Sequence, residues 1–349
     1  MNILHKLRGR FLLFAVLSVA LLGTVGWSLM TGQVTVPVDN VLTIAGQQLA
    51  LPVGQAAVPT AEQTAVIWHI RLPRALVGIL AGAALAVSGA VLQGVFNNPL
   101  ADPGIIGVSS GAALGAVSAI ALDLTSVSIF YMPVCALLGA VLAVGLIVLL
   151  ALRQGKLSPS MLLLGGVAVS MLLGAVTSAI LTVLNEQRVR EFLFWLVGGL
   201  DYRRWEHVYM AAGPVLLGII ILCCMARQLN VLILGEQEAR AVGMPVARLR
   251  LTFLLLSSVT TAAAVCVTGT IGFVGLLVPH VMRLLAGPEH RVLLPACALA
   301  GGLFLVFCDT LGRVIVSSLE IRVGIMTALV GAPYFLYLLY KAQQKGGLS

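Results

Sequence analysis

The residues that could bind a metal or a nucleotide do not stand at the spacings that such chemistry requires. The Gly155-Lys156 pair lacks the earlier glycine of a Gly-x-x-x-x-Gly-Lys-[Ser/Thr] phosphate loop. None of the cysteines forms a Cys-x-x-Cys pair, and His280 after Pro279 is typical of a structural hydrogen-bonding partner. Paired carboxylates, a zinc signature and a Ser-His-Asp arrangement are also absent from the sequence. We therefore predict no catalytic residue, metal site or cofactor on this chain, and no enzymatic activity.

The composition is that of a membrane protein. The chain is 60% hydrophobic and 10% charged, and its mean hydropathy is +1.06. Soluble domains carry about 25% charged residues, and no single water-soluble core would bury so much apolar surface. We expect an all-α polytopic membrane protein in which residues 1–349 form one transmembrane domain, without a separate soluble module.

Apolar segments long enough to cross a bilayer recur along the whole chain. The segment near residue 280 is the shortest, because glycines and Pro279 interrupt it, and we expect a turn followed by a short or broken helix there. We predict about ten transmembrane helices, at residues 11–30, 75–95, 105–122, 129–152, 161–184, 208–226, 252–270, 272–287, 292–311 and 323–341.

Basic residues set the predicted orientation. The first apolar segment follows a basic start, and we expect it to be retained rather than cleaved as a signal peptide. Placing the N-terminus in the cytoplasm puts most Lys and Arg residues on that side, as the positive-inside rule requires. The predicted location is the cytoplasmic (inner) membrane, with both termini inside. The net charge of +8 then reflects this bias and not a nucleic-acid-binding patch.

One stretch of the chain occurs twice. Residues 88–99 align without a gap on residues 268–279, and each copy is expected to end a helix and break it with Gly and Pro. The copies lie five spans apart, so the predicted topology makes them antiparallel. We expect inverted repeat halves at about 71–185 and 251–341, spans 2–5 against spans 7–10. Inverted repeats with broken helices build solute pathways, so transport is the leading functional interpretation.

A polar, Pro- and Gly-rich motif follows the second predicted span, and such a segment cannot continue a lipid-facing helix. A plain loop is the simpler interpretation of it. The motif consists of Asn98, Pro99, Leu100, Ala101, Asp102, Pro103 and Gly104. It follows Arg71-Leu72-Pro73-Arg74 and precedes Gly272-Phe273-Val274-Gly275 and Gly331-Ala332-Pro333. Over about residues 65–345, these motifs resemble the FecCD-type permeases, the membrane subunits of binding-protein-dependent ABC importers for ferric siderophores, heme and cobalamin.

The resemblance implies a set of partners. It implies ten spans per subunit and a homodimer embedded in membrane lipids. It also implies two cytoplasmic ATP-binding cassette ATPase subunits, which would bind the ATP and Mg that this chain cannot, and an extracytoplasmic substrate-binding protein.

Three arginines are candidates for docking of the binding protein. Arg71 and Arg74 stand where the second span begins, and Arg313 ends the ninth. Exposed arginines bond carboxylates on a partner in a directional way, and the resemblance assigns these positions to docking. Two alternatives remain open, which are snorkelling at the interface and an internal pair of Arg313 with Asp309.

Two cytoplasmic segments are candidates for coupling and gating. The loop after the sixth span is bracketed by Gly and Pro, which predicts a short rigid helix, and the resemblance marks it as the ATPase-coupling helix rather than a solvated turn. The residues of the loop before the fifth span predict a helix cap, and the resemblance implies that this loop is a cytoplasmic gate. The coupling residues are Gly235, Glu236, Glu238, Ala239, Arg240 and Gly243, and the gate residues are Ser158, Pro159, Ser160 and Met161.

The predicted function is a permease subunit of an ABC importer that moves an iron chelate, heme or a ferric siderophore, inward across the membrane. A cobalamin importer of the same family is the alternative. An ion-coupled secondary transporter is a more distant one, because such carriers bury ionisable residues at mid-membrane, whereas Asp102, Asp309 and Glu320 are predicted near span ends. An integral membrane enzyme acting on a lipid is the last alternative.

Overall fold

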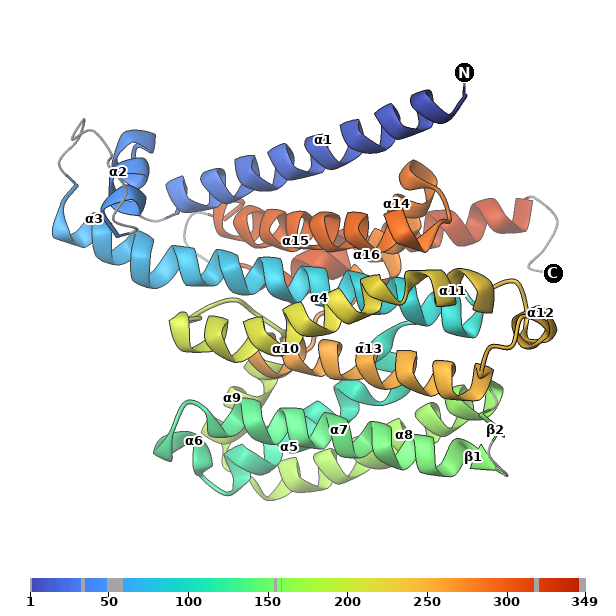
Figure 1. Cartoon of the computed structure of the whole chain (residues 1–349). Helices are drawn as coiled ribbons and strands as arrows, with labels where there is room; N and C mark the ends of the chain where they lie inside the picture. Colours follow the sequence, from blue (N-terminus) through green and yellow to red (C-terminus); the bar gives the residue numbers. More distant parts are fainter. Residues whose placement is uncertain are drawn as a thin grey trace.

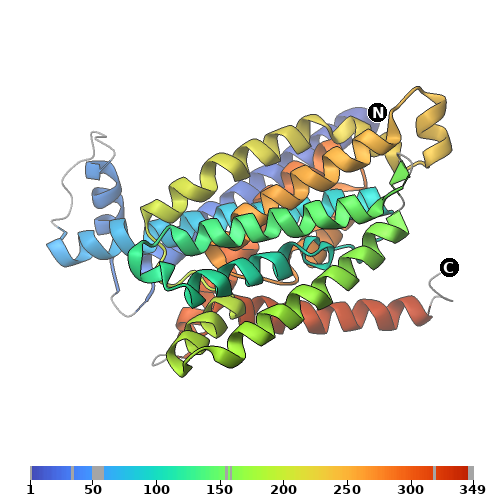
Figure 2. The same ribbon diagram turned by 90° about the horizontal axis from the view of Figure 1, so that it is seen from below.

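The computed structural model describes residues 2–32, 35–48, 59–153, 156–157, 159–316 and 320–344. Over this part of the chain the protein is a bundle of apolar helices (Figure 1 and Figure 2). Among the described residues, seven helices are long and apolar enough to cross a membrane, and α5, α14 and α16 are shorter apolar helices. The helices are α1 (Asn2–Met30), α4 (Leu72–Phe96), α5 (Val108–Ala121), α7 (Tyr131–Ala151), α8 (Pro159–Val183), α10 (Trp205–Cys224), α13 (Val246–Thr268), α14 (Val274–Ala286), α15 (His290–Val314) and α16 (Val323–Gln344).

These ten helices coincide with the ten predicted spans, so the expected fold class is confirmed. Short elements join them, and α2 and α3 among these were not predicted. The short elements are α2 (Val38–Gln48), α3 (Ala61–Ala65), the π-helical turn η1 (Val66–Arg71), the 3-10 turn η2 (Pro103–Ile106), α6 (Leu124–Val127), the paired strands β1 (Leu152–Arg153) and β2 (Lys156–Leu157), α9 (Glu186–Val197), α11 (Ala226–Leu232) and α12 (Glu236–Ala241).

The two ends of the bundle differ in the elements that they carry. The start of α1, the end of α16, the β1–β2 hairpin and α12 lie at one end, whereas α2, α3, α6 and α9 lie at the other (Figure 1). The first end holds the segments predicted to be cytoplasmic, and we call it the inner end. We call the opposite end, which holds the segments predicted to be extracytoplasmic, the outer end.

Helix α4 is the centre of the packing. Nearly every residue from Pro73 to Phe96 is buried. It approaches α15 closely, so that a Cβ atom added to Gly82 would lie 2.1 Å from the carbonyl oxygen of Gly301. Backbone contact of this kind is possible only between residues without side chains, and small residues are how membrane helices pack closely.

The inverted repeat is visible in the order and direction of the helices. In the series α4, α5, α7, α8 and in the series α13, α14, α15, α16, the second helix is the shortest. Helix α4 runs from the outer to the inner end and α13 runs back (Figure 1). The chain therefore contains two antiparallel halves.

The residue-level alignment of the two copies is wrong. Residues 88–96 are helical within α4, whereas Thr268 ends α13 and residues 269–273 form no helix. The cause lies at Gly269, which has a φ of +74° and packs so closely that a Cβ atom would lie 2.0 Å from the carbonyl oxygen of Trp195. Its aligned partner Gly89 stays inside a helix, because it packs against the backbone of Gly275.

Candidate functional site

A buried cluster of ion pairs lies at the outer end. Arg74, near the start of α4, contacts Asp309 of α15 through Nε and Nη2, at 3.0 and 2.9 Å. Its Nη2 also contacts Asp201 at 3.0 Å, and its Nη1 contacts Glu320 at 2.9 Å. A buried guanidinium needs such partners, because unpaired charge is costly to remove from water. Arg74 thus ties both halves of the repeat to the segment between α9 and α10.

Arg71 and Arg313 hold the end of α1. Arg71 Nη1 donates to the carbonyl oxygen of Leu29 at 2.7 Å. Arg313 Nη2 donates to the Ser28 hydroxyl at 2.6 Å, and its Nη1 donates to the carbonyl oxygen of Thr31 at 3.2 Å. The last carbonyl groups of a helix lack partners within the helix, so the two arginines act as a cap.

The exposure expected for the three docking arginines is therefore wrong. Arg71 and Arg74 are 5% and 7% exposed, and the side chain of Arg313 is 4% exposed. The alternative of an internal pair is confirmed, because Arg313 Nε lies 3.4 Å from Asp309 Oδ2. A docking role for these residues stays a prediction.

Sequence reasoning missed a fourth arginine of this cluster. Arg322 donates through Nη1 to the carbonyl oxygen of Phe194, and its guanidinium lies 4.5 Å from the centre of the Phe194 ring. Its Nε is 3.7 Å from Asp201. Because 121 residues separate Asp201 from Arg322 along the chain, no local spacing could have indicated this contact.

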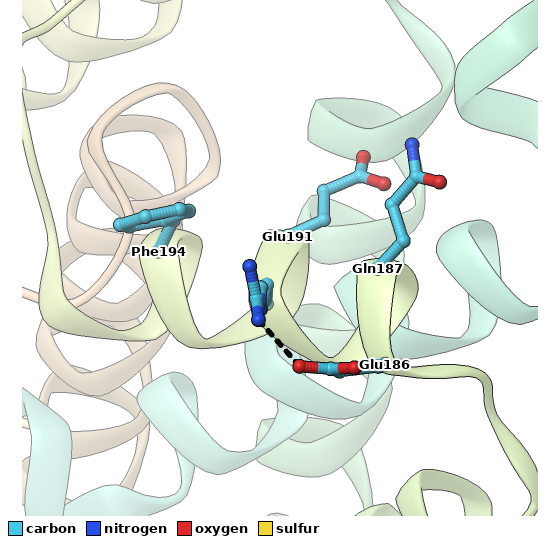
Figure 3. Close-up of a pocket in the computed structure, with 5 residues that line it drawn as sticks. Glu186, Gln187, Glu191 and Phe194 are labelled. Carbon is cyan, nitrogen blue, oxygen red and sulfur yellow. Dashed lines mark hydrogen bonds and ion pairs between the residues drawn. The ribbon is translucent and has the colours of Figure 1, made fainter.

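Two hollows open beside α9 at the outer end. A hollow of about 610 Å³ lies over α9 and is lined by Glu186, Gln187, Arg190, Glu191 and Phe194 (Figure 3). The Glu186–Arg190 ion pair lies on its wall. A smaller pocket of about 180 Å³ shares Glu191 and Phe194 with it. This region offers the space and the charge for a polar ligand.

The predicted break after the second span is confirmed at Asn97, which follows α4 in a left-handed conformation. The Asn98 Oδ1 atom accepts a hydrogen bond from the backbone N–H of Leu100 at 2.9 Å. Asp102 accepts one from Gly104 at 2.8 Å, and so caps the turn η2. Surrounding protein raises the pKa of the Asp102 carboxyl above its ordinary value. Within the motif Ala101 and Pro103 are buried, whereas Pro99 and Leu100 are exposed, so the turn lies only partly inside the protein.

Gln93 links the two halves near this break. Its Nε2 donates to the carbonyl oxygen of Gly275 at 3.0 Å, and its Oε1 accepts from Arg283 Nη2 at 3.0 Å. The ring of His280 packs edge-on against Tyr334, with ring centres 6.1 Å apart. Among the described residues there is no group of three His, Cys, Asp or Glu side chains that could hold a metal ion.

The predicted coupling helix exists as α12. It lies between Gly235 and Gly243, both with positive φ, and extends beyond the neighbouring helices at the inner end (Figure 1). Glu236 pairs with Arg240 within α12 and with Arg250 of α13 at 2.7 Å. Ala239 is fully buried, which fixes one face of the helix against the bundle.

Exposed apolar residues flank α12, which sequence reasoning did not single out. Leu234 is 70% exposed and Val242 is 67% exposed. Glu238 and Arg240 are exposed between them. The result is a small rigid knob with apolar edges and a charged centre, which is suited to a groove on a partner protein.

The structure describes only some of the predicted gate residues. Ser158 lies outside the described residues, Pro159 begins α8, and Met161 is exposed in its first turn. The helix start expected at Pro159 is confirmed.

Comparison with known proteins decides the family. Residues 17–341 match the FecCD transport family. The chain belongs to the FecCD transport family. This FecCD permease is 50% identical over 285 residues to the cobalamin import system permease protein BtuC of Halobacterium salinarum, covering 82% of this chain and 76% of that protein. It is 40% identical to the hemin transport system permease protein HmuU of Yersinia pestis, covering 80% and 85% of the two chains.

A solved structure supports the same assignment. The FecCD permease resembles a chain of "an inward-facing conformation of a putative metal-chelate type ABC transporter", with a TM-score of 0.83 and 34% identity over 95% of this chain and 99% of that one. The protein is thus a multi-pass membrane permease, related to permease proteins of import systems.

Proposed function

We propose that this FecCD permease forms the membrane pathway through which an ABC importer brings a metal chelate into the cell. The match over residues 17–341 carries the proposal, because it spans both halves of the repeat and the coupling segment. Two further features support the proposal. The sequence has no phosphate loop for binding ATP, and α12 offers a rigid contact surface for a separate ATPase.

Two classes of metal chelate are candidate substrates. An iron chelate is supported by the resemblance to the Yersinia pestis hemin permease, and cobalamin by the higher identity to the Halobacterium salinarum permease. The experiment is ATP-driven uptake into proteoliposomes that contain the permease, its ATPase and its binding protein, with hemin, a ferric siderophore and cobalamin compared. Uptake of none of the three would contradict the proposal.

We infer that the permease works as a homodimer and that α8 supplies part of the contact. Exposed positions of α8 include small residues such as Ala168, Gly174 and Ser178, and no atom of the described residues lies within 4 Å of a Cβ position at Gly174. The hydroxyl of Thr177 is buried without a hydrogen-bond partner in the described part of the chain. Small and hydroxyl-bearing residues are typical of surfaces where membrane helices meet, rather than of lipid-facing surfaces.

The same proposal gives α12 and the arginine cluster their roles. Helix α12 would transmit the movement of the ATPase to α13 through the Glu236–Arg250 contact. The termini would lie in the cytoplasm, at the same end as α12. The arginines predicted to dock the binding protein would hold the ends of α1, α4 and α15 in place beneath it, because their own hydrogen bonds are already used inside the permease.

A further inference from the structure

An arginine whose side chain makes no hydrogen bond to the described residues lies in the smaller outer pocket. Arg203 belongs to the segment between α9 and α10, and it lines the pocket of about 180 Å³ together with Trp195, Tyr202 and Arg322. The side chain of Arg203 makes no hydrogen bond or ion pair within the part of the chain that the structure describes, and its Nε atom is buried without an acceptor. The indole Nε1 of Trp195 is also buried without an acceptor. Two donors that line one pocket thus lack the acceptors that buried donors normally have.

The nearby carboxylates make no hydrogen bond or ion pair with the Arg203 guanidinium. Asp201 attracts it electrostatically, but Asp201 pairs with Arg74 at 3.0 Å and lies 3.7 Å from Arg322. Glu191 lines the same pocket but forms no ion pair with Arg203. Burial lowers the pKa of Arg203 to about 10, so its guanidinium still carries a charge at neutral pH.

The larger hollow next to this pocket gives a ligand room. Its volume of about 610 Å³ lies within the range of small-molecule sites, roughly 300–1,000 Å³. Glu191 and Phe194 line both spaces, so a ligand over α9 is adjacent to the pocket (Figure 3). A pocket of about 180 Å³ is too small for the body of a metal chelate and large enough for one polar group at its edge.

We propose that Arg203, with Trp195 and Arg322 beside it, forms an oxyanion subsite that binds a carboxylate or phosphodiester group on the edge of the incoming chelate. The subsite rests on the proposed importer function and adds a substrate class to it, namely chelates with a peripheral oxyanion. Charged donors aimed at an oxyanion make short and strong hydrogen bonds, and no described residue accepts a hydrogen bond from the Arg203 side chain. The subsite would not strengthen the binding of chelates that carry only neutral groups at their edge.

Matched pairs of ligands test the subsite. Hemin is compared with hemin dimethyl ester, which lacks the carboxylates, and cobalamin with cobinamide, which lacks the phosphodiester. In the reconstituted permease, ATPase and binding-protein complex, Arg203→Gln should lower uptake of the oxyanion-bearing member by about tenfold. Uptake of the matched neutral member should stay within about twofold, and Arg203→Lys should restore part of the loss.

Two controls separate the possible causes. Arg188→Gln removes an arginine that pairs with Asp123 and lines neither hollow, so it should change the uptake of neither member of a pair. Glu191→Gln removes the competing carboxylate and should raise uptake of the oxyanion-bearing member. An equal loss of both members in Arg203→Gln, or no loss at all, would overturn the subsite and leave the importer function standing. Absence of ATP-driven uptake of every ligand by the unaltered complex would overturn both.

Discussion

Arg74 and Asp309 join two halves of the protein that are far apart in sequence. Their side chains meet in a two-pronged contact, with Arg74 Nη2 and Nε at 2.9 and 3.0 Å from the carboxylate oxygens, and both are nearly inaccessible to solvent. Asp309 also pairs with Arg313, which caps α1. The pair is therefore the centre of a network that fixes three membrane helices at the outer end.

The first prediction concerns this pair. Asp309→Asn should lower the free energy of unfolding by about 3–5 kcal/mol, because it leaves the buried guanidinium of Arg74 with weaker partners. The exposed pair Glu186–Arg190 is the matched control, and Arg190→Gln should cost less than about 1 kcal/mol. Denaturant titration in detergent, followed by tryptophan fluorescence, measures both. If Asp309→Asn and Arg190→Gln lowered the free energy of unfolding by the same small amount, the buried Arg74–Asp309 pair would not hold the helices together.

The second prediction concerns the contact between α4 and α15. Gly82→Ala should destabilise the protein, because the new Cβ atom would lie 2.1 Å from the carbonyl oxygen of Gly301 and would push the two helices apart. Gly145→Ala in α7 is the control, since no atom lies within 4 Å of its Cβ position and alanine is favoured in helices by up to about 1 kcal/mol. Thermal unfolding should show a lower unfolding temperature for Gly82→Ala and a higher one for Gly145→Ala. An unchanged unfolding temperature in Gly82→Ala would contradict the close packing.

The third prediction concerns α12. Leu234→Asp and Val242→Asp place charges on the exposed apolar edges of the knob, so both should weaken binding of the ATPase while leaving the fold intact. Copurification of the ATPase and its transport-coupled hydrolysis rate are the measurements. Ala239→Asp should instead unfold this segment, because Ala239 is fully buried. Normal coupling in the two surface variants would rule out α12 as the contact.

The fourth prediction follows from Asp102, outside the membrane-spanning helices. Burial raises the pKa of this carboxyl in the folded protein, so the unfolded chain releases the proton first as pH rises. The contribution of Asp102 to stability is therefore greatest below its ordinary pKa, about 3.9, and declines as pH rises through and above that value. Asp102→Asn should remove this dependence and keep the acceptor for Gly104, whereas Asp102→Ala should cost about 1 kcal/mol of stability through the lost cap.

Much of this fold could be predicted from local pattern. The spans followed from the lengths of the apolar runs, and the break at Asn97 and the helix α12 followed from Gly and Pro at their ends. These features depend on residues that are close together in the sequence, so they can be predicted from composition and spacing.

The remaining features depend on contacts that no local pattern encodes. The arginines at the outer end looked exposed because they stand at span ends, yet Asp309, Asp201 and Glu320 reach Arg74 from distant segments. The alignment of the repeat failed for the same reason, since the end of α13 at Gly269 is set by packing against Trp195. Tertiary contact overrides local resemblance at both places.

The central claim is that this permease is a two-fold pathway whose motor is a separate ATPase. The most direct measurement compares chelate uptake into proteoliposomes that contain the permease alone with uptake when the ATPase, the binding protein and ATP are present. The permease alone should hydrolyse no ATP and accumulate no chelate against a gradient, and the complete complex should do both. Accumulation by the permease alone, driven by a proton or sodium gradient, would contradict the account.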